Sequence, residues 1–122
     1  MSTSTDPVKV TLNQKFVSEN GCPATAEMFE RLAKLAAHSD TGGASVAAQL
    51  LLALYDGAEY PFDLTELCRL DSGLLSDALN AIEFRVRERI EPHEFFQNGG
   101  QLFQQIAKTW NLVPKSQQSP EA

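Results

Sequence analysis

The segment from Ala44 to Tyr55 constrains the fold most, because it has helical length and contains no charged residue. On a helix, its valine, alanines and leucines occupy most of the circumference instead of one stripe. Such a helix is stable only where other elements cover it on several sides. We therefore expect residues 43–56 to form the central, most buried helix of an all-α fold.

The segments around this helix have the signals of shorter amphipathic helices. In residues 25–39 apolar side chains recur at helical spacing, and glycine or proline corners at Gly42, Gly57, Pro92 and Gly99 separate the segments. We predict a compact bundle of about five helices, over residues 25–39, 43–56, 64–70, 73–91 and 101–111. The inward stripe of the fourth is expected to be Leu74, Leu75, Ala78, Leu79, Ile82, Val86 and Ile90.

The two ends of the chain are expected to lie outside this bundle, which we place in a single helical domain over residues 24–112. Residues 1–23 are predicted to be a partly extended N-terminal arm, in which Val8, Val10 and Leu12 alternate as in a strand. A second copy of the chain is one possible partner for that strand. Residues 113–122 are polar and predicted to be a loose, flexible C-terminal tail.

The charge of the chain weighs against several classes of partner. Its formal net charge is -6 and its pI is near 4.8, so its average field repels nucleic acid and anionic membranes. It has no apolar run of membrane-spanning length, and its first residues resemble no secretory signal, so we expect a cytoplasmic protein. Cys22 and Cys68 are expected to be free thiols.

The residues that usually carry catalysis are sparse. The two histidines have no spacing that would place paired metal ligands on one helical face. A zinc site built from Cys22, Cys68, His38 and His93 is conceivable, but it lacks paired ligand spacing. No serine lies in a nucleophile elbow. We therefore expect no catalytic residue, no metal, no cofactor, no small-molecule substrate and no enzymatic activity.

An acid-rich segment is the most distinctive charge feature. Between Asp56 and Asp77, six carboxylates are opposed only by Arg69. Helix caps explain part of this pattern, because acids are favoured at helix starts, and a patch for a basic partner is the alternative. The aromatic residues at connectors, Tyr60, Phe62, Phe95 and Phe96, are expected to be exposed for contacts, and Tyr60 and Phe62 alternatively cover the core. The predicted protein-interaction residues are Asp56, Glu59, Tyr60, Phe62, Asp63 and Glu66.

The segment from Phe62 to Glu91 also resembles the helix-turn-helix of winged DNA-binding proteins, with a short helix, a tight turn and a longer helix. The nucleic-acid candidates under this hypothesis are Arg85, Arg87 and Arg89, which interleave with glutamates and are alternatively a solvated face of ion pairs. The start of the long helix offers no Arg or Lys, and no wing follows. Both features disfavour duplex binding.

Three stretches together resemble a known family. They are the corner Ser39-Asp-Thr-Gly-Gly, the stretch Phe62-Asp-Leu-Thr-Glu-Leu and the pair Leu70-Asp71. They look like a family of small proteobacterial proteins of unknown function, often encoded on plasmids and integrated mobile elements, over residues 28–112. The resemblance implies a bacterial cytoplasmic accessory protein that acts on host or plasmid machinery. It implies no activity and no functional residues.

These observations lead to a ranked pair of functional expectations. The first is a small acidic helical interaction module that binds another protein or itself, as a homodimer, with an inhibitor of host machinery as a special case. The alternative is a helix-turn-helix DNA-binding regulator that acts through residues 62–91.

Overall fold

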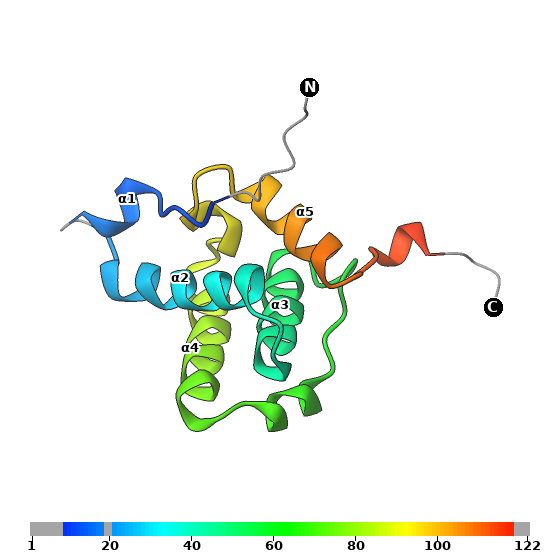
Figure 1. Ribbon diagram of the computed structural model, residues 1–122. Coiled ribbons are helices and arrows are strands. Elements are labelled where there is room, and N and C mark those ends of the chain that lie inside the picture. Colours follow the sequence, from blue (N-terminus) through cyan, green and yellow to red (C-terminus); the bar gives the residue numbers. More distant parts are fainter. Residues whose placement is uncertain (1–8, 19–20, 119–122) are drawn as a thin grey trace.

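Helices make up most of the structure, a computed structural model that describes residues 9–18 and 21–118 (Figure 1). Within those ranges no strand forms, apart from one isolated β-bridge. The predicted all-α class is therefore confirmed. In chain order the elements are α1 (Gln14–Val17), α2 (Pro23–His38), α3 (Gly42–Tyr55), the 3-10 helix η1 (Leu64–Arg69), α4 (Ser72–Glu88), the 3-10 helix η2 (Pro92–Phe95), α5 (Gly99–Thr109) and the 3-10 helix η3 (Lys115–Gln117).

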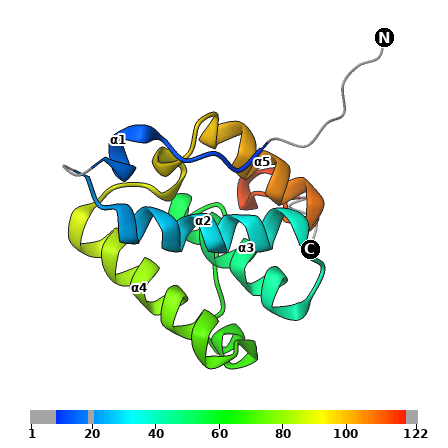
Figure 2. The same ribbon diagram turned by 60° about the vertical axis from the view of Figure 1, so that its left-hand side comes forward.

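The uncharged helix α3 is the centre of the fold, as its sequence predicts. It contacts α2, α4, α5, η1 and η2. In two views α2 crosses the middle of the molecule, with α3 and α4 below it and α1 and α5 above it (Figures 1 and 2). Covered on several sides, α3 buries Ala44, Val46, Ala47, Ala48, Leu50, Leu51 and Leu52.

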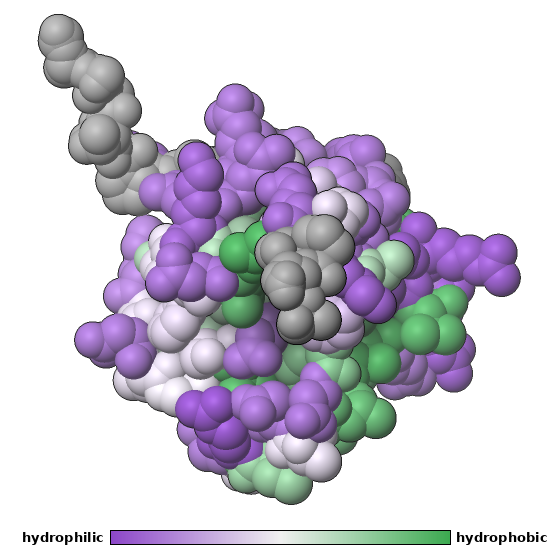
Figure 3. Space-filling model, turned by 90° about the vertical axis from the view of Figure 1, so that its right-hand side faces the viewer, coloured by the Kyte–Doolittle hydropathy of each residue, from purple (hydrophilic) through white to green (hydrophobic). Residues whose placement is uncertain are grey.

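The long helix α4 is rotated relative to the sequence prediction. Its buried residues are Ala78 and Ala81, whereas Leu79 is 49% and Val86 is 70% exposed. The prediction that Leu79 and Val86 point inward is therefore wrong. Small alanine side chains let the backbone of α4 approach its neighbours closely, which leaves the larger apolar row outside. Figure 3 views the side of the molecule that lies on the right in Figure 1, and it shows hydrophobic surface in its lower half, the level at which η1 lies in Figure 1.

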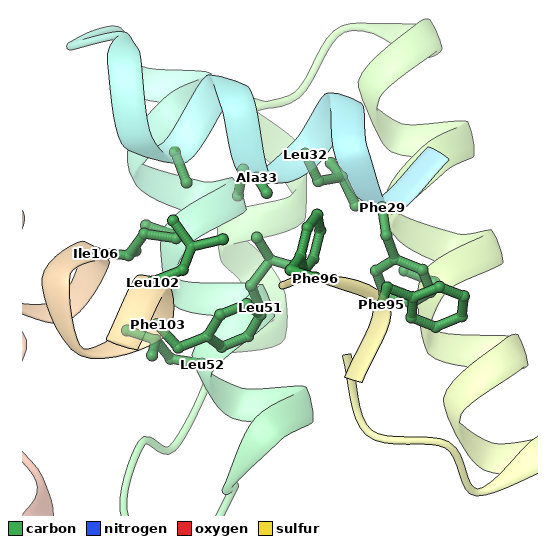
Figure 4. Close-up of a cluster of buried hydrophobic side chains, with 14 of the residues drawn as sticks. Phe29, Leu32, Ala33, Leu51, Leu52, Phe95, Phe96, Leu102, Phe103 and Ile106 are labelled. Atoms are coloured by element: carbon green, nitrogen blue, oxygen red, sulfur yellow. The ribbon is translucent and has the colours of Figure 1, made fainter. Parts of the chain in front are cut away.

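Phenylalanine rings join the elements of the core. The ring of Phe95 lies 4.3 Å from that of Phe16 and 4.7 Å from that of Phe29, and the rings of Phe96 and Phe103 are 6.2 Å apart. Figure 4 shows Phe29, Phe95, Phe96 and Phe103 among the buried side chains of the core. Phe95 and Phe96 are 0% and 2% exposed, so the prediction that they are exposed at the surface is wrong. The turn of η2 directs them inward.

The N-terminal arm pairs within its own chain. Leu12 forms an antiparallel bridge with Phe96, supported by hydrogen bonds from Asn13 N to Phe95 O (2.7 Å) and from Gln97 N to Thr11 O (2.8 Å). The described residues thus show pairing within one chain instead of the alternative, pairing with a second copy, and α1 interrupts the predicted extended arm with one helical turn. Val8, the first residue of the predicted strand, lies outside the described residues.

Two helix ends differ from their predicted positions for local reasons. α4 ends at Glu88 instead of residue 91, because Arg89 adopts a left-handed conformation with φ of 60°. α5 begins at Gly99 instead of residue 101, directly after Asn98, whose φ is 56°. A Cβ atom on Gly99 would lie 1.9 Å from the carbonyl oxygen of His93, so only glycine fits there.

The segment predicted to be a loose tail is partly ordered. Lys115 N donates to Glu59 O, and Ser116 N donates to the Glu59 Oε1 atom, both at 2.8 Å. These bonds attach η3 to the connector that follows α3. Residues 119–122 of the predicted tail lie outside the described residues.

Among the described residues, no helix is both long enough and apolar enough to span a membrane.

Candidate functional site

The carboxylates of the acid-rich segment each have a local bonding partner. Asp63 Oδ1 accepts hydrogen bonds from Thr65 N (2.9 Å) and Thr65 Oγ1 (2.7 Å), and these bonds lower the pKa of Asp63. Glu66 accepts from Arg69 at 2.7 Å. Asp56 Oδ1 accepts from Glu59 N at 3.4 Å. These contacts match the capping and ion-pairing alternative, so the acids form no convergent cluster.

Glu59 holds the segment that follows α5. The backbone N–H of Ser116 donates to its carboxylate, and this hydrogen bond lowers the pKa of Glu59. Two more acids of the segment act in the same local way. Asp71 Oδ1 caps α4 by accepting from Leu74 N at 2.8 Å, and Asp77 forms a two-bond ion pair with Arg31 at 2.9 and 3.0 Å.

Tyr60 and Phe62 are half-buried. Their position is intermediate between the two predicted alternatives, exposure for contacts and covering of the core. Tyr60 packs against the core, and its burial is the main cause of the raised pKa of its hydroxyl. It also lines a groove of about 650 Å³ with Lys108, Leu112 and Val113. Tyr60 therefore covers the core on one side and forms part of the surface on the other.

The three candidate arginines are divided between two grooves, because Arg85 and Arg89 line one groove and Arg87 lines another. Arg85 Nε donates to the carbonyl oxygen of Leu54 at 2.9 Å, so it is tied to α3. Arg87 pairs with Glu83 at 2.9 Å and lines a groove of about 410 Å³ between α2 and α4. Arg89 is exposed, and within the described residues its side chain has no hydrogen bond or ion pair. A single basic surface is thus not formed by these residues.

The helix-turn-helix segment has the predicted order of elements, with η1, a tight corner at Leu70–Asp71 and then α4. The opening turns of α4 carry Ser72, Ser76 and Asn80 on exposed positions and no Lys or Arg. The acid Asp77 is already paired with Arg31. The element after α4 is η2, in the position where a winged protein has a β-hairpin.

The four residues of the zinc alternative are not brought together. Within residues 9–18 and 21–118, no group of three or more His, Cys, Asp or Glu side chains is placed to hold a metal ion. His93 packs edge-on against Tyr55, with ring centroids 4.9 Å apart. Its buried Nδ1 atom has no hydrogen-bond partner in the part of the chain that the structure describes, and a carboxylate oxygen of Glu91 is 3.7 Å away.

The feature that sequence reasoning missed is an exposed apolar row on α4. We call Leu75, Leu79, Ile82 and Val86 the outer row; Leu75 and Ile82 are half-buried, and Leu79 and Val86 are exposed. The sequence of α4 does contain the pattern that could have revealed this row, because it carries two apolar rows at helical spacing, one of alanines and one of larger residues. Of the predicted inward stripe, Leu74, Ala78 and Ile90 do pack inward, whereas the outer row was wrongly assigned to the core.

Two further features add apolar surface outside the outer row. Leu64 on η1 is 69% exposed, although it is apolar. At the other end of α4, Val86 lies on a groove of about 600 Å³ formed with the end of α3, and Ala53, Leu54 and Gly57 supply much of its lining. Arg85 and Arg89 lie along the same groove. Apolar surface thus continues from α4 onto α3, with cations at its edge.

Comparisons with known proteins identify a family but no function. The model of a family of unknown function (DUF7673) matches residues 26–111, a range that includes α2, α3, α4 and α5. No curated protein and no solved structure matches the chain. The predicted membership in a family of unknown function is confirmed in this coarse form, and the match begins within α2, after the N-terminal arm.

Proposed function

The chain belongs to the DUF7673 family, whose function is unknown, and we propose that it is a non-enzymatic interaction protein that binds a protein partner through the outer face of α4. The observation that carries the proposal is the outer row, with Leu79 49% and Val86 70% exposed. Single exposed apolar residues are common, but several aligned on one helix are typical of a contact surface.

The energetics favour a covered outer row. Burying an aliphatic side chain completely contributes about 1.5–3 kcal/mol relative to leaving it in water. Within one described chain, Leu79 and Val86 obtain only part of that contribution. A partner that covers them, together with Leu64 on η1, supplies the remainder.

The proposed contact with the partner is on α4, whereas the sequence placed it on the connector and short helix from Asp56 to Glu66. Asp56, Glu59, Asp63 and Glu66 are engaged in local hydrogen bonds or ion pairs. Asp63 and Glu66 flank Leu64 in the sequence and supply negative charge beside it. In this proposal they select partners by charge, and the outer row provides the apolar area.

The resemblance to small proteobacterial proteins suggests where in the cell such an interaction takes place. It favours a role in the bacterial cytoplasm as an accessory factor of plasmids or integrated mobile elements. Within that setting, an inhibitor that covers a surface of host machinery is one form of the same function.

Site-specific photocrosslinking in cells tests the proposal. A photoreactive amino acid replaces Leu79, and the matched control replaces Gln101, an exposed residue on α5. We expect a reproducible protein adduct from position 79 and none of the same mass from position 101. Absence of any adduct at position 79, or identical adducts at both positions, would contradict the proposal.

The alternative proposal is DNA binding through residues 62–91. It is supported by the succession of η1, a tight corner and α4, and by the unpaired guanidinium of Arg89 within the part of the chain that the structure describes. It predicts salt-sensitive binding to duplex DNA, measured by fluorescence anisotropy, that weakens in Arg89→Ala more than in Arg87→Ala. The Arg87 control is already paired with Glu83. No binding at low salt excludes this alternative.

A further inference from the structure

The outer row of α4 is symmetric in its spacing. Leu75, Leu79, Ile82 and Val86 follow at intervals of four, three and four residues, so the row is the same from either end. A second copy of α4 that runs antiparallel therefore matches it about a two-fold axis between positions 80 and 81. In that register Leu75 faces the partner's Val86, and Leu79 faces the partner's Ile82.

The charges at the two ends of α4 are complementary in the same register. Asp71 precedes the first turn of α4, and Arg89 follows the last. In an antiparallel pair, Arg89 is level with the partner's Ser72 and beside the partner's Asp71. The helix dipoles also oppose each other favourably. A parallel pair would instead place Arg89 against the partner's Arg89, and like charges repel.

In the same two-fold arrangement, Leu64 of each chain lies near an apolar groove of the other chain. Because η1 directly precedes α4, the partner's η1 comes to lie near the end of this chain's α4. The groove lined by Ala53, Leu54 and Val86 is located there, with Arg85 and Arg89 along it. The partner's Leu64 enters that apolar groove, and the partner's Asp63 and Glu66 approach the arginines.

Resting on the proposed function, we infer that the partner of the outer face is a second copy of this chain, in an antiparallel, two-fold contact of α4 with α4. One helix and one 3-10 turn per chain form a contact at the small end of specific interfaces. The dimer is accordingly concentration-dependent, and the monomer remains folded because its phenylalanine core lies elsewhere.

Sedimentation equilibrium on the full chain over a wide concentration range tests the dimer. We expect the mass to rise from 13.4 kDa toward twice that value. Leu79→Glu is expected to raise the dissociation constant by about tenfold or more, because it buries a charge against the partner's Ile82. Asn80→Glu adds the same charge on a side of α4 that faces away from the outer row, and it leaves dimerisation unchanged. A monomer at every concentration overturns the inference.

Cysteine crosslinking tests the antiparallel register. In a background with Cys22→Ser and Cys68→Ser, the single variants Leu75→Cys and Val86→Cys are oxidised alone and as a mixture. An antiparallel pair crosslinks the mixture and leaves each single variant uncrosslinked, because positions 75 of the two chains are then far apart. Crosslinking of Leu75→Cys with itself, or no crosslink in the mixture, overturns the register.

The two proposals fail in different ways. If the protein is monomeric at all concentrations while photocrosslinking at position 79 captures another protein, the second-copy inference is wrong and the interaction function stands. If neither experiment gives a contact at position 79, both proposals are wrong. Circular dichroism of each variant shows that its fold is retained.

Discussion

The ring of Phe95 is stacked on that of Phe29, with centroids 4.7 Å apart and an interplanar angle of 22°. Phe95 comes from η2 and Phe29 from α2, so this contact fixes the turn after α4 onto the rest of the fold. Phe95 is also 4.3 Å from Phe16 of α1. One side chain thus joins the arm, α2 and η2.

Replacing Phe95 should therefore destabilise the protein strongly. Phe95→Ala leaves a cavity between three elements and is expected to cost about 3–5 kcal/mol in the free energy of unfolding. Phe62→Ala is the control, because Phe62 is half-buried and should cost clearly less. Urea denaturation followed by circular dichroism measures both values. Equal losses for the two variants would show that Phe95 is not a core residue.

The two rows of α4 should respond oppositely to substitution. Val86→Gln changes a 70% exposed residue and is expected to alter the unfolding free energy by no more than about 0.5 kcal/mol. Ala81→Leu adds volume at a fully buried position and is expected to cost about 1–3 kcal/mol. Denaturation in dilute solution separates these effects from association. The reverse order would restore the orientation predicted from the sequence.

Acid should weaken the start of η1 through Asp63. Hydrogen bonds from Thr65 lower the pKa of Asp63 in the folded state. The stabilisation is therefore complete above the unfolded pKa, roughly 4, and is lost as the pH falls through the lower folded value. Asp63→Asn should flatten the decline of the melting temperature between neutral pH and about pH 3. An equal decline of the melting temperature in the Asp63→Asn variant and the unchanged protein would show that Asp63 does not contribute to the acid sensitivity.

The two cysteines should differ in reactivity. Cys68 is exposed, whereas Cys22 is half-buried, and its burial and the nearby charge of Glu88 raise its pKa. The thiolate is the reactive form, so iodoacetamide should modify Cys68 first at about pH 8. Peptide mass spectrometry distinguishes the two sites, and Cys22 should react at a comparable rate only after denaturation. Equal rates in the native protein would contradict the burial of Cys22.

Sequence patterns predicted the central helix because its evidence is local and redundant. From Ala44 to Tyr55 there is no charge, and Thr41 caps the helix with a 3.1 Å bond to Ala44 N. An uncharged helix with a clear start has few alternatives. The corners at Gly42, Gly57 and Pro92 were found for the same reason, since their backbone preferences act within a few residues.

The orientation of α4 could not be predicted, because it depends on how closely neighbouring helices approach. Both rows of α4 are apolar, and packing decides that Ala81 is buried while Leu79 and Val86 are exposed. The burial of Phe95 and Phe96 could not be predicted from the sequence either, because their contact partners lie on α1, α2 and α5. The outer row, the main candidate site, therefore emerged only from the structure.

The arm has a consequence for the order in which the chain folds during synthesis. Asn13 Nδ2 donates to the carbonyl of Glu94, and Gln97 Nε2 to that of Leu12, across separations of 81 and 85 residues. The ribosome releases the arm before α2, α3 and α4, and it releases the arm's partners only after these helices. Helices α2 and α3 can form beforehand from contacts between neighbouring segments. The arm therefore remains unpaired until residues 94–97 have been synthesised, and only then can it dock beside η2.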